Sequence, residues 1–412
     1  MMRLAMGLAL STAMVIGAVC DAAEPRMAAY QQEMLELAYA GVSEMPLSPH
    51  IKNRSRAQLK TARACLELNN PELAETFVAG IRNWQQSMGY ADIAAYYAEQ
   101  GMDEQAQAFI GKVTPALRMS EDIRSGKVAF STPNPLIDTL VDRRYEAVLT
   151  RVEEVRRMGR AAEPAEAQEL AFGTVNAAHL NAGAAADRAA DITAALAALE
   201  PFIAHDNFEI AYYGFHELAR VLERHYDGVD LNRMLEQVVK PRLTKVPVFL
   251  RIELYLEYAG LAARNRDMDA VAPILSELEG MVDGLKPRPR YYIPESVRVL
   301  KLMIEIGELE KAAAQVDALL AYYHEKRDLI VNIERAELVC GLAETYHLLG
   351  QDDVALNLYR RAVDEGMINP NSRPQADDLN RICCSLALHE VKPDDALLQQ
   401  LNAMRSGLGN PW

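Results

Sequence analysis

Two segments far apart in this sequence carry similar residue types at the same seven positions. The positions hold, in order, a large apolar residue, a small residue, an aromatic, a glycine, an alanine and two further apolar residues, and a third segment keeps this spacing. A chain that repeats one helical pattern folds as stacked units, because each unit buries its apolar face against the next. The aligned residues are Ile93, Ala94, Tyr97, Gly101, Ala106, Ile110 and Val113; Leu342, Ala343, Tyr346, Gly350, Ala355, Tyr359 and Ala362; and Val299, Leu300, Met303, Gly307, Ala312, Val316 and Leu319.

Each copy predicts two helices joined by a tight turn. Gly350 and its counterparts fall one residue past a predicted helix end, where a positive φ is usual. Asn70, which precedes a proline, and Asp352 are expected to cap the helices that follow. Ala343 and Ala355 lie where the two helices cross, and a bulky side chain there would push the backbones apart.

The spacing of the copies divides the chain into regions. Alanines that open the second helix recur at intervals of 42, 43 and 41 residues in the C-terminal part. We therefore expect N-terminal repeats over 24–124, a divergent helical region over 136–245 and an array of units of about 42 residues over 246–412. The recurring residues are Ala270, Ala312, Ala355 and Ala396. The middle region predicts helices over 140–158, 165–180, 185–199, 208–224 and 231–238, and proline-rich breaks are expected at 126–135, 240–247 and 286–294.

This pattern resembles the tetratricopeptide repeat (TPR), although the usual proline near the repeat end is displaced and the period is uneven. The resemblance implies an all-α solenoid of stacked helix–turn–helix repeats, whose first helices line a concave groove that binds peptides or proteins. Glu337, Glu344 and His347 would form one polar stripe there, suited to a basic or amphipathic partner segment. The groove positions carried over from the family are Glu337, Cys340, Glu344 and His347 in one copy, and Lys301 and Tyr255 in the two copies before it.

Residues 1–23 have the plan of a secretory signal peptide. Arg3 precedes a stretch from Leu4 to Val19 that is apolar except for two hydroxyl residues, and small residues follow it. That stretch is shorter than the roughly 20 residues of a membrane-spanning helix. We expect export to the periplasm or the medium, with cleavage near Ala23. Cys20 leaves open a lipoprotein anchored through that residue.

The composition argues against several function classes. The formal net charge is −15, which disfavours nucleic acid as the partner. No nucleotide-binding, hydrolase or zinc motif occurs, so we expect no enzyme activity, cofactor or metal. His216 and His225 are nine residues apart and point to opposite helix faces, unlike a metal pair. The four cysteines after the signal are interpreted as buried apolar residues, and whether Cys340, Cys383 or Cys384 forms a disulfide stays open.

These observations predict a function of binding. We expect an exported TPR-like scaffold that holds a partner protein or peptide in its groove, with no membrane span in the mature chain. Two alternatives stay open: a structural component that assembles through its solenoid ends, and an α/α enzyme that uses dispersed carboxylates.

Overall fold

The structure is a computed structural model that describes residues 27–114, 135–158 and 175–412. Within these ranges every regular element is a helix, which confirms the all-α prediction. The predicted signal segment and most of the predicted break at 126–135 lie outside the described residues. No helix in the described ranges has both the length and the apolar character needed to cross a bilayer.

The helices follow one another as antiparallel hairpins, and the first helix of each C-terminal hairpin packs on the first helix of the next. Residues 103–114 are also helical. The bounds are α1 (Ala29–Ser43), α2 (Leu47–Glu67), α3 (Pro71–Ala79), α4 (Gln85–Glu99), α6 (Pro135–Met158), α7 (Val175–Asp187), α8 (Ile192–Ile203), α9 (Phe208–Arg224), α10 (Leu231–Met234), α11 (Lys240–Arg242), α12 (Val248–Arg264), α13 (Met268–Asp283), α14 (Pro289–Glu305), α15 (Leu309–Lys326), α16 (Asn332–Leu348), α17 (Asp352–Met367), α18 (Ser372–Leu388) and α19 (Asp395–Ser406).

The turns inside the hairpins share one backbone conformation. Gly350 has a φ of 73°, and the N–H of the next residue, Gln351, bonds the carbonyl of Tyr346 at 2.9 Å, as in a helix end closed by a left-handed residue. The prediction for the turn glycines is therefore confirmed. The same left-handed conformation occurs at three further residues that are not glycine, so the turn is a property of the repeat. These residues are Asn69, Arg266 and Glu390.

Predictions for helix crossings and caps are confirmed at several positions. Ala343 and Ala355 are fully buried between their helices. The side chain of Asn70 accepts a hydrogen bond of 3.0 Å from the backbone N–H of Leu73, which caps α3. All four cysteines in the described ranges are buried, with free thiols.

One of these local predictions, the cap at Asp352, is wrong. Asp352 is the first helical residue of α17 and caps nothing; its carboxylate lies 2.7 Å from the ring of His347. Ala396 lies in the first turn of α19, as expected of an alanine that opens the second helix, but it is exposed and Leu397 takes the buried position. The cap of α19 is Asp394, so the inward position falls on the third residue after it.

Two predicted breaks are displaced. Helix α7 runs unbroken to Asp187, although a break was expected after Leu180. Gly183 within it makes room for the guanidinium of Arg157 from α6, where a Cβ would collide. Helix α14 begins at Pro289, and Pro294 lies inside it. A first-turn proline suits a helix start because its missing N–H would have had no intrahelical acceptor.

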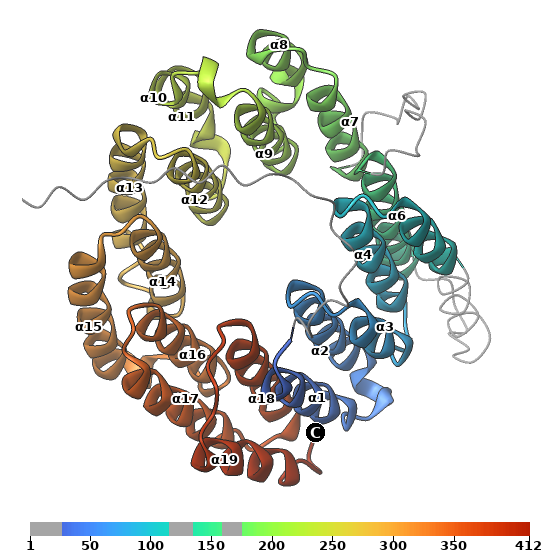
Figure 1. The fold of residues 1–412 in the computed structure, drawn as a ribbon, viewed down its shortest axis with the longest axis vertical. Coiled ribbons are helices and arrows are strands. Elements are labelled where there is room, and N and C mark those ends of the chain that lie inside the picture. Colours follow the sequence, from blue (N-terminus) through green and yellow to red (C-terminus); the bar gives the residue numbers. More distant parts are fainter. Residues whose placement is uncertain (1–26, 115–134, 159–174) are drawn as a thin grey trace, which may run out of the picture.

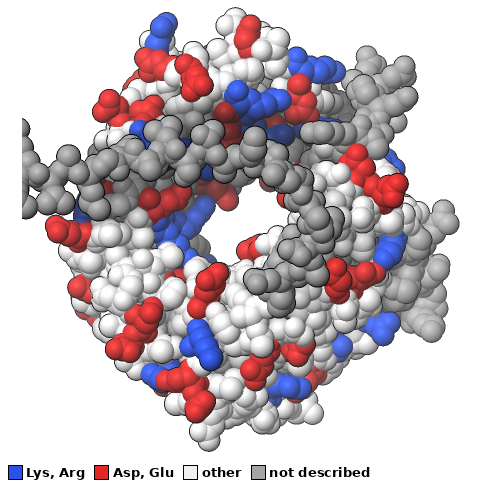
Figure 2. Space-filling view, viewed as in Figure 1, with Lys and Arg blue, Asp and Glu red and all other residues white. Residues whose placement is uncertain are grey.

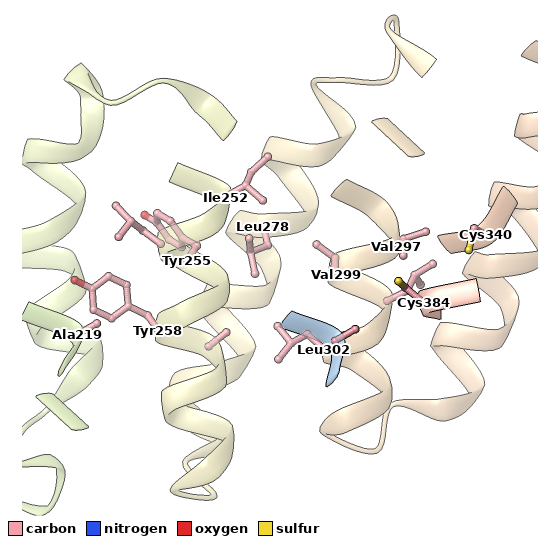
Figure 3. Close-up of a cluster of buried hydrophobic side chains, with 14 of the residues drawn as sticks. Ala219, Ile252, Tyr255, Tyr258, Leu278, Val297, Val299, Leu302, Cys340 and Cys384 are labelled. Carbon is pink, nitrogen blue, oxygen red and sulfur yellow. The ribbon is translucent and has the colours of Figure 1, made fainter. Parts of the chain in front are cut away.

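One apolar core runs from the first helices to the last. Figure 3 shows buried side chains of this core on several helices, with Tyr258 of α12 directed toward Ala219 of α9 and Leu302 lying on α14. The Tyr258 hydroxyl donates a hydrogen bond of 2.9 Å to the carbonyl of Phe215 in α9, so even this fully buried polar atom is satisfied. Packing of neighbour on neighbour is what a solenoid requires.

The solenoid closes on itself into a ring. Figure 1 shows the helices arranged around a central opening, with α18 and α19 beside α1 and α2. Helix α1 packs against both α18 and α2, and α18 also packs directly on α2. The two ends of the repeat array therefore cover one another.

The closure is made by specific contacts. Gln31 donates a side-chain hydrogen bond of 2.8 Å to the carbonyl of Ala387, and Arg405 lies 3.2 Å from Glu44. Gly41 allows α1 to approach α18, since a Cβ there would lie 2.7 Å from Leu379. A small apolar cluster completes the contact; it contains Val42, Met45, Ala57 and Ala376, with Leu408 and Trp412 packed against it.

Candidate binding site on the inner wall

The opening of the ring is bordered by one layer of helices. In Figure 1 these include α2, α9, α12, α14, α16 and α18, while α13, α15, α17 and α19 form the outer layer. Figure 2 shows that the opening passes through the molecule and has acidic and basic side chains at its border. Since the outer helices cover the backs of the inner ones, we interpret the partly exposed polar contacts from one inner helix to the next as lining the opening.

Such contacts form a nearly continuous circuit, which we call the inner-wall belt. Each pair connects a helix to the next one around the ring, with nitrogen–oxygen distances from 2.6 to 4.0 Å. Between α18 and α2 the contact is buried instead: the Asn380 amide donates a hydrogen bond of 2.5 Å to the Thr61 hydroxyl, and both residues are at most 2% exposed. The pairs of the belt are Arg63–Asp92, Asp92–Arg151, Glu154–His179, His216–Glu257, Glu253–Arg298, Lys301–Glu344 and Glu337–Arg381.

One largely buried part of the belt is centred on Glu344. Its carboxylate lies 2.6 Å from the ammonium of Lys301 and accepts a 2.5 Å hydrogen bond from the Ser385 hydroxyl, which in turn meets Tyr359 at 2.8 Å. His389 lies 3.8 Å from the same carboxylate. Burial alone would raise the pKa of Glu344, but attraction to Lys301 and His389 and the hydrogen bonds outweigh it and hold the pKa below the ordinary value. The cluster joins α14, α16, α17 and α18.

Glu344 therefore has a different role from the one expected. Its side chain is only 16% exposed and is committed to Lys301 and Ser385. Glu344 was expected to face a partner as a groove residue, whereas here Lys301 and Ser385 of the neighbouring repeats supply the partners for its charge. Lys301 is 30% exposed and remains in contact with solvent.

The other predicted groove residues are dispersed. Glu337 is 53% exposed at the inner wall and pairs with Arg381 at 3.1 Å. His347 turns to Asp352, so it does not join the carboxylates of its own helix in a stripe. Cys340 and Tyr255 are buried in the core, with 1% and 6% exposed, and neither offers a surface to a partner.

A second polar cluster lies on the other side of the ring, around His179 of α7. Its ring stacks on Tyr213 with centroids 4.2 Å apart, and its Nε2 lies 3.2 Å from Glu154. Burial lowers the pKa of His179, against the attraction of Glu154. On α9, the hydrogen bond between His216 and Glu257 of α12 raises the pKa of His216. Sequence reasoning argued only against a metal pair with His225 and missed the pairing of His216 with Glu257.

Beside His179 the inner wall opens into a cavity of about 400 Å³ lined by charged groups of both signs. No group of three or more His, Cys, Asp or Glu side chains in the described part of the chain is arranged to hold a metal ion. The arrangement can exchange hydrogen bonds and ion pairs with a polar ligand. The charged residues lining the cavity are Arg63, Asp92, Arg151, Glu154 and His179.

A sequence signal for the belt exists at the repeat period. Glu257, Lys301 and Glu344 are 44 and 43 residues apart and occur on successive first helices. Charges of alternating sign at the period of the repeat predict ion pairs between neighbouring repeats. Lys301 and Glu344 form such a pair, whereas Glu257 pairs with His216 of α9.

Comparisons with known proteins give one structural likeness. The chain is similar to a solved structure described as "Circular tandem repeat protein with novel repeat topology and enhanced subunit contact surfaces", with 15% identity over 92% of this chain and 94% of that one and a TM-score of 0.27. No family model and no curated protein matches. At this identity and TM-score the likeness carries no information about function. The helical repeats themselves suggest a scaffold or binding role.

Proposed function

We propose that this protein is an exported helical scaffold that binds a partner protein or peptide within the opening of its ring. The observation that carries the proposal is the inner-wall belt. Ion pairs with neighbouring helices hold its charged side chains in place, but these side chains remain in contact with water. The side chains of Glu253, Arg298 and Glu337 are 47%, 40% and 53% exposed. A partner meets these groups already positioned, and this lowers the entropic cost of binding.

Ring closure bears on the choice between this role and end-to-end assembly. In an open solenoid, exposed terminal repeats offer apolar faces on which further copies stack. Here α1 covers α18, and the contact buries Met45 and Ala376. The faces needed for end-to-end assembly are thus already occupied within one chain, and we favour binding inside the ring.

Photo-crosslinking tests the proposed site. A photoreactive phenylalanine analogue is placed either at Arg298 on α14, 40% exposed at the inner wall, or at Lys311 on α15 in the outer layer, which is 43% exposed. The protein is irradiated in its own host. We expect protein adducts from position 298 and few from 311. Equal adducts from both positions, or none from 298, would contradict binding in the opening.

Export is proposed on the composition of residues 1–23. Intact-mass measurement of the protein from its own host tests it, and the expected species begins near Glu24 without lipid. A diacylated or triacylated chain beginning at Cys20 would establish a lipoprotein instead, and a chain that retains residues 1–23 would rule out both forms of export.

A further inference from the structure

Helix α2 is unusually basic for this acidic chain. It carries five Lys or Arg residues before its first carboxylate, Glu67, whereas the whole chain has a net charge of −15. Four of the five recur at intervals of four, four and three residues, which places them on one helix face. We call them the α2 stripe; they are Lys52, Arg56, Lys60 and Arg63, and all four are exposed.

The α2 stripe lies on the inner wall. Helices α1 and α3 pack on α2, α18 and α4 flank it, and its remaining side borders the opening (Figure 1). At one end of the stripe Arg63 reaches across to Asp92 of α4 at 2.7 Å. On the opposite side, the positive charges of Arg56 and Lys60 lower the pKa of the Asp377 carboxyl in α18, against the effect of burial. Side chains that face both flanking helices point between them, toward the opening.

Most of this positive charge has no counter-ion at contact distance. Across the described ranges no carboxylate lies within ion-pair distance of Lys52, Arg56 or Lys60, although most of the inner wall is paired. Asp377 is already paired with Arg373 at 3.3 Å, and burial raises its pKa despite the surrounding cations. Unpaired like charges on successive turns repel each other, so this arrangement costs stability that an anionic ligand would restore.

We propose that the α2 stripe binds an acidic segment of a partner polypeptide in the opening of the ring. The inference rests on the proposed function and adds the charge of the partner. From Lys52 to Arg63 the stripe spans about 16 Å along the helix, at 1.5 Å per residue. About five residues of extended chain cover the same length, so carboxylates on alternate residues meet successive turns of the stripe.

A polypeptide fits this position better than other polyanions. The stripe is recessed in the wall of a ring, where a flat anionic bilayer does not reach. Nucleic acid would place phosphates beside the carboxylates of Asp92 and Glu337 and against the net charge of −15. A peptide can leave neutral side chains next to those carboxylates and put its own acidic groups on the cations.

Fluorescence anisotropy on the full chain tests the proposal. The probe is a labelled peptide of eight residues that alternates Glu with Gly, and the matching Lys–Gly peptide and a single-stranded oligonucleotide serve as comparisons. The variant is Arg56→Glu with Lys60→Glu. The control, Arg188→Glu with Lys392→Glu, makes the same change in net charge at exposed basic residues outside the stripe. Melting curves verify folding, and Arg56→Gln with Lys60→Gln replaces the first variant if the reversal unfolds the chain.

We expect the Glu–Gly peptide to bind saturably and more weakly as salt rises, and the stripe variant to lose at least about tenfold in affinity while the control changes less than about twofold. An equal loss in both variants, preference for the Lys–Gly peptide, or tighter binding of the oligonucleotide to the stripe would overturn the proposal. If position 298 gives adducts but the Glu–Gly peptide does not bind, the proposed function stands and the acidic partner is wrong. If neither occurs, both fail.

Discussion

Replacing Glu344 by alanine tests whether the largely buried cluster around Glu344 stabilises the ring. The substitution removes a charge-assisted contact to Lys301 and a hydrogen bond from Ser385. Hydrogen bonds to charged groups contribute about 1.5–3 kcal/mol each. The net cost is smaller than their sum, because Lys301 is 30% exposed and can turn to water, and Ser385 keeps its contact with Tyr359. We expect Glu344→Ala to lower the free energy of unfolding by about 2–3 kcal/mol.

The matched control is Glu337→Ala on the same helix. Glu337 also pairs with one basic residue, Arg381, but its side chain is 53% exposed. Exposed pairs contribute about 0–1 kcal/mol, so this variant is expected to change little. Urea unfolding followed by circular dichroism measures both, with the slope checked for partial unfolding of single repeats. Equal losses of unfolding free energy in the two variants would refute the burial of the Glu344 carboxylate.

The pH dependence of the same cluster has a definite sign. The folded-state pKa of Glu344 lies below the ordinary value of 4.5, so the ionised carboxylate stabilises the fold above that value. This contribution is lost as pH falls through the lower folded-state pKa. The difference in stability between the wild type and Glu344→Gln is therefore expected to be constant near neutral pH and to shrink below about pH 4.

Three further predictions concern packing, a buried ion pair and the thiols. Ala355→Leu is expected to cost about 1–3 kcal/mol in urea unfolding by overpacking a helix crossing, while Gln351→Leu at the exposed turn costs little; equal effects would disprove the repeat register. Glu365 is 2% exposed and binds Arg327 through two contacts of 2.7 and 2.8 Å. We expect Glu365→Ala to lower the free energy of unfolding by about 3 kcal/mol, and a loss below 1 kcal/mol would contradict that pairing. All four thiols are expected to react with a disulfide reagent only after unfolding, because burial raises their pKa values, to about 11 for Cys384; fast labelling of the native protein would show an exposed cysteine.

Local features of the hairpins could be predicted from the sequence because they depend on residues a few positions apart. The glycine turn at Gly350 and the cap at Asn70 are of this kind. The cap assigned to Asp352 was one residue off, since an Asp in the first helical turn is also stabilised by the helix dipole and gives the same sequence signal. Ala396 opens α19 as predicted, but the buried position falls on Leu397, the third residue after the Asp394 cap.

Ring closure and the pairing of Glu344 depend on residues far apart in the chain. Closure is the sum of small rotations between repeats, and no single repeat encodes that sum. The contacts that complete it, such as Gln31 with Ala387, join segments 356 residues apart and leave no periodic trace. Glu344 was assigned to a groove from its place in one repeat, but its burial is set by Lys301 and Ser385 in the repeats on either side.

Crosslinking across the closure tests the ring most directly. In the closed ring Glu44 and Arg405 lie 3.2 Å apart, whereas in an open solenoid they would be at opposite ends of the chain. The variant carries Glu44→Cys and Arg405→Cys, which removes only an exposed ion pair, and is treated with a short bismaleimide. The control pairs Glu44→Cys with Arg264→Cys on α12, across the opening (Figure 1). A closed ring predicts an intramolecular crosslink in the first variant and none in the control. Failure of the first pair to crosslink within a monomer, with both thiols shown to be reactive, would contradict the closed ring.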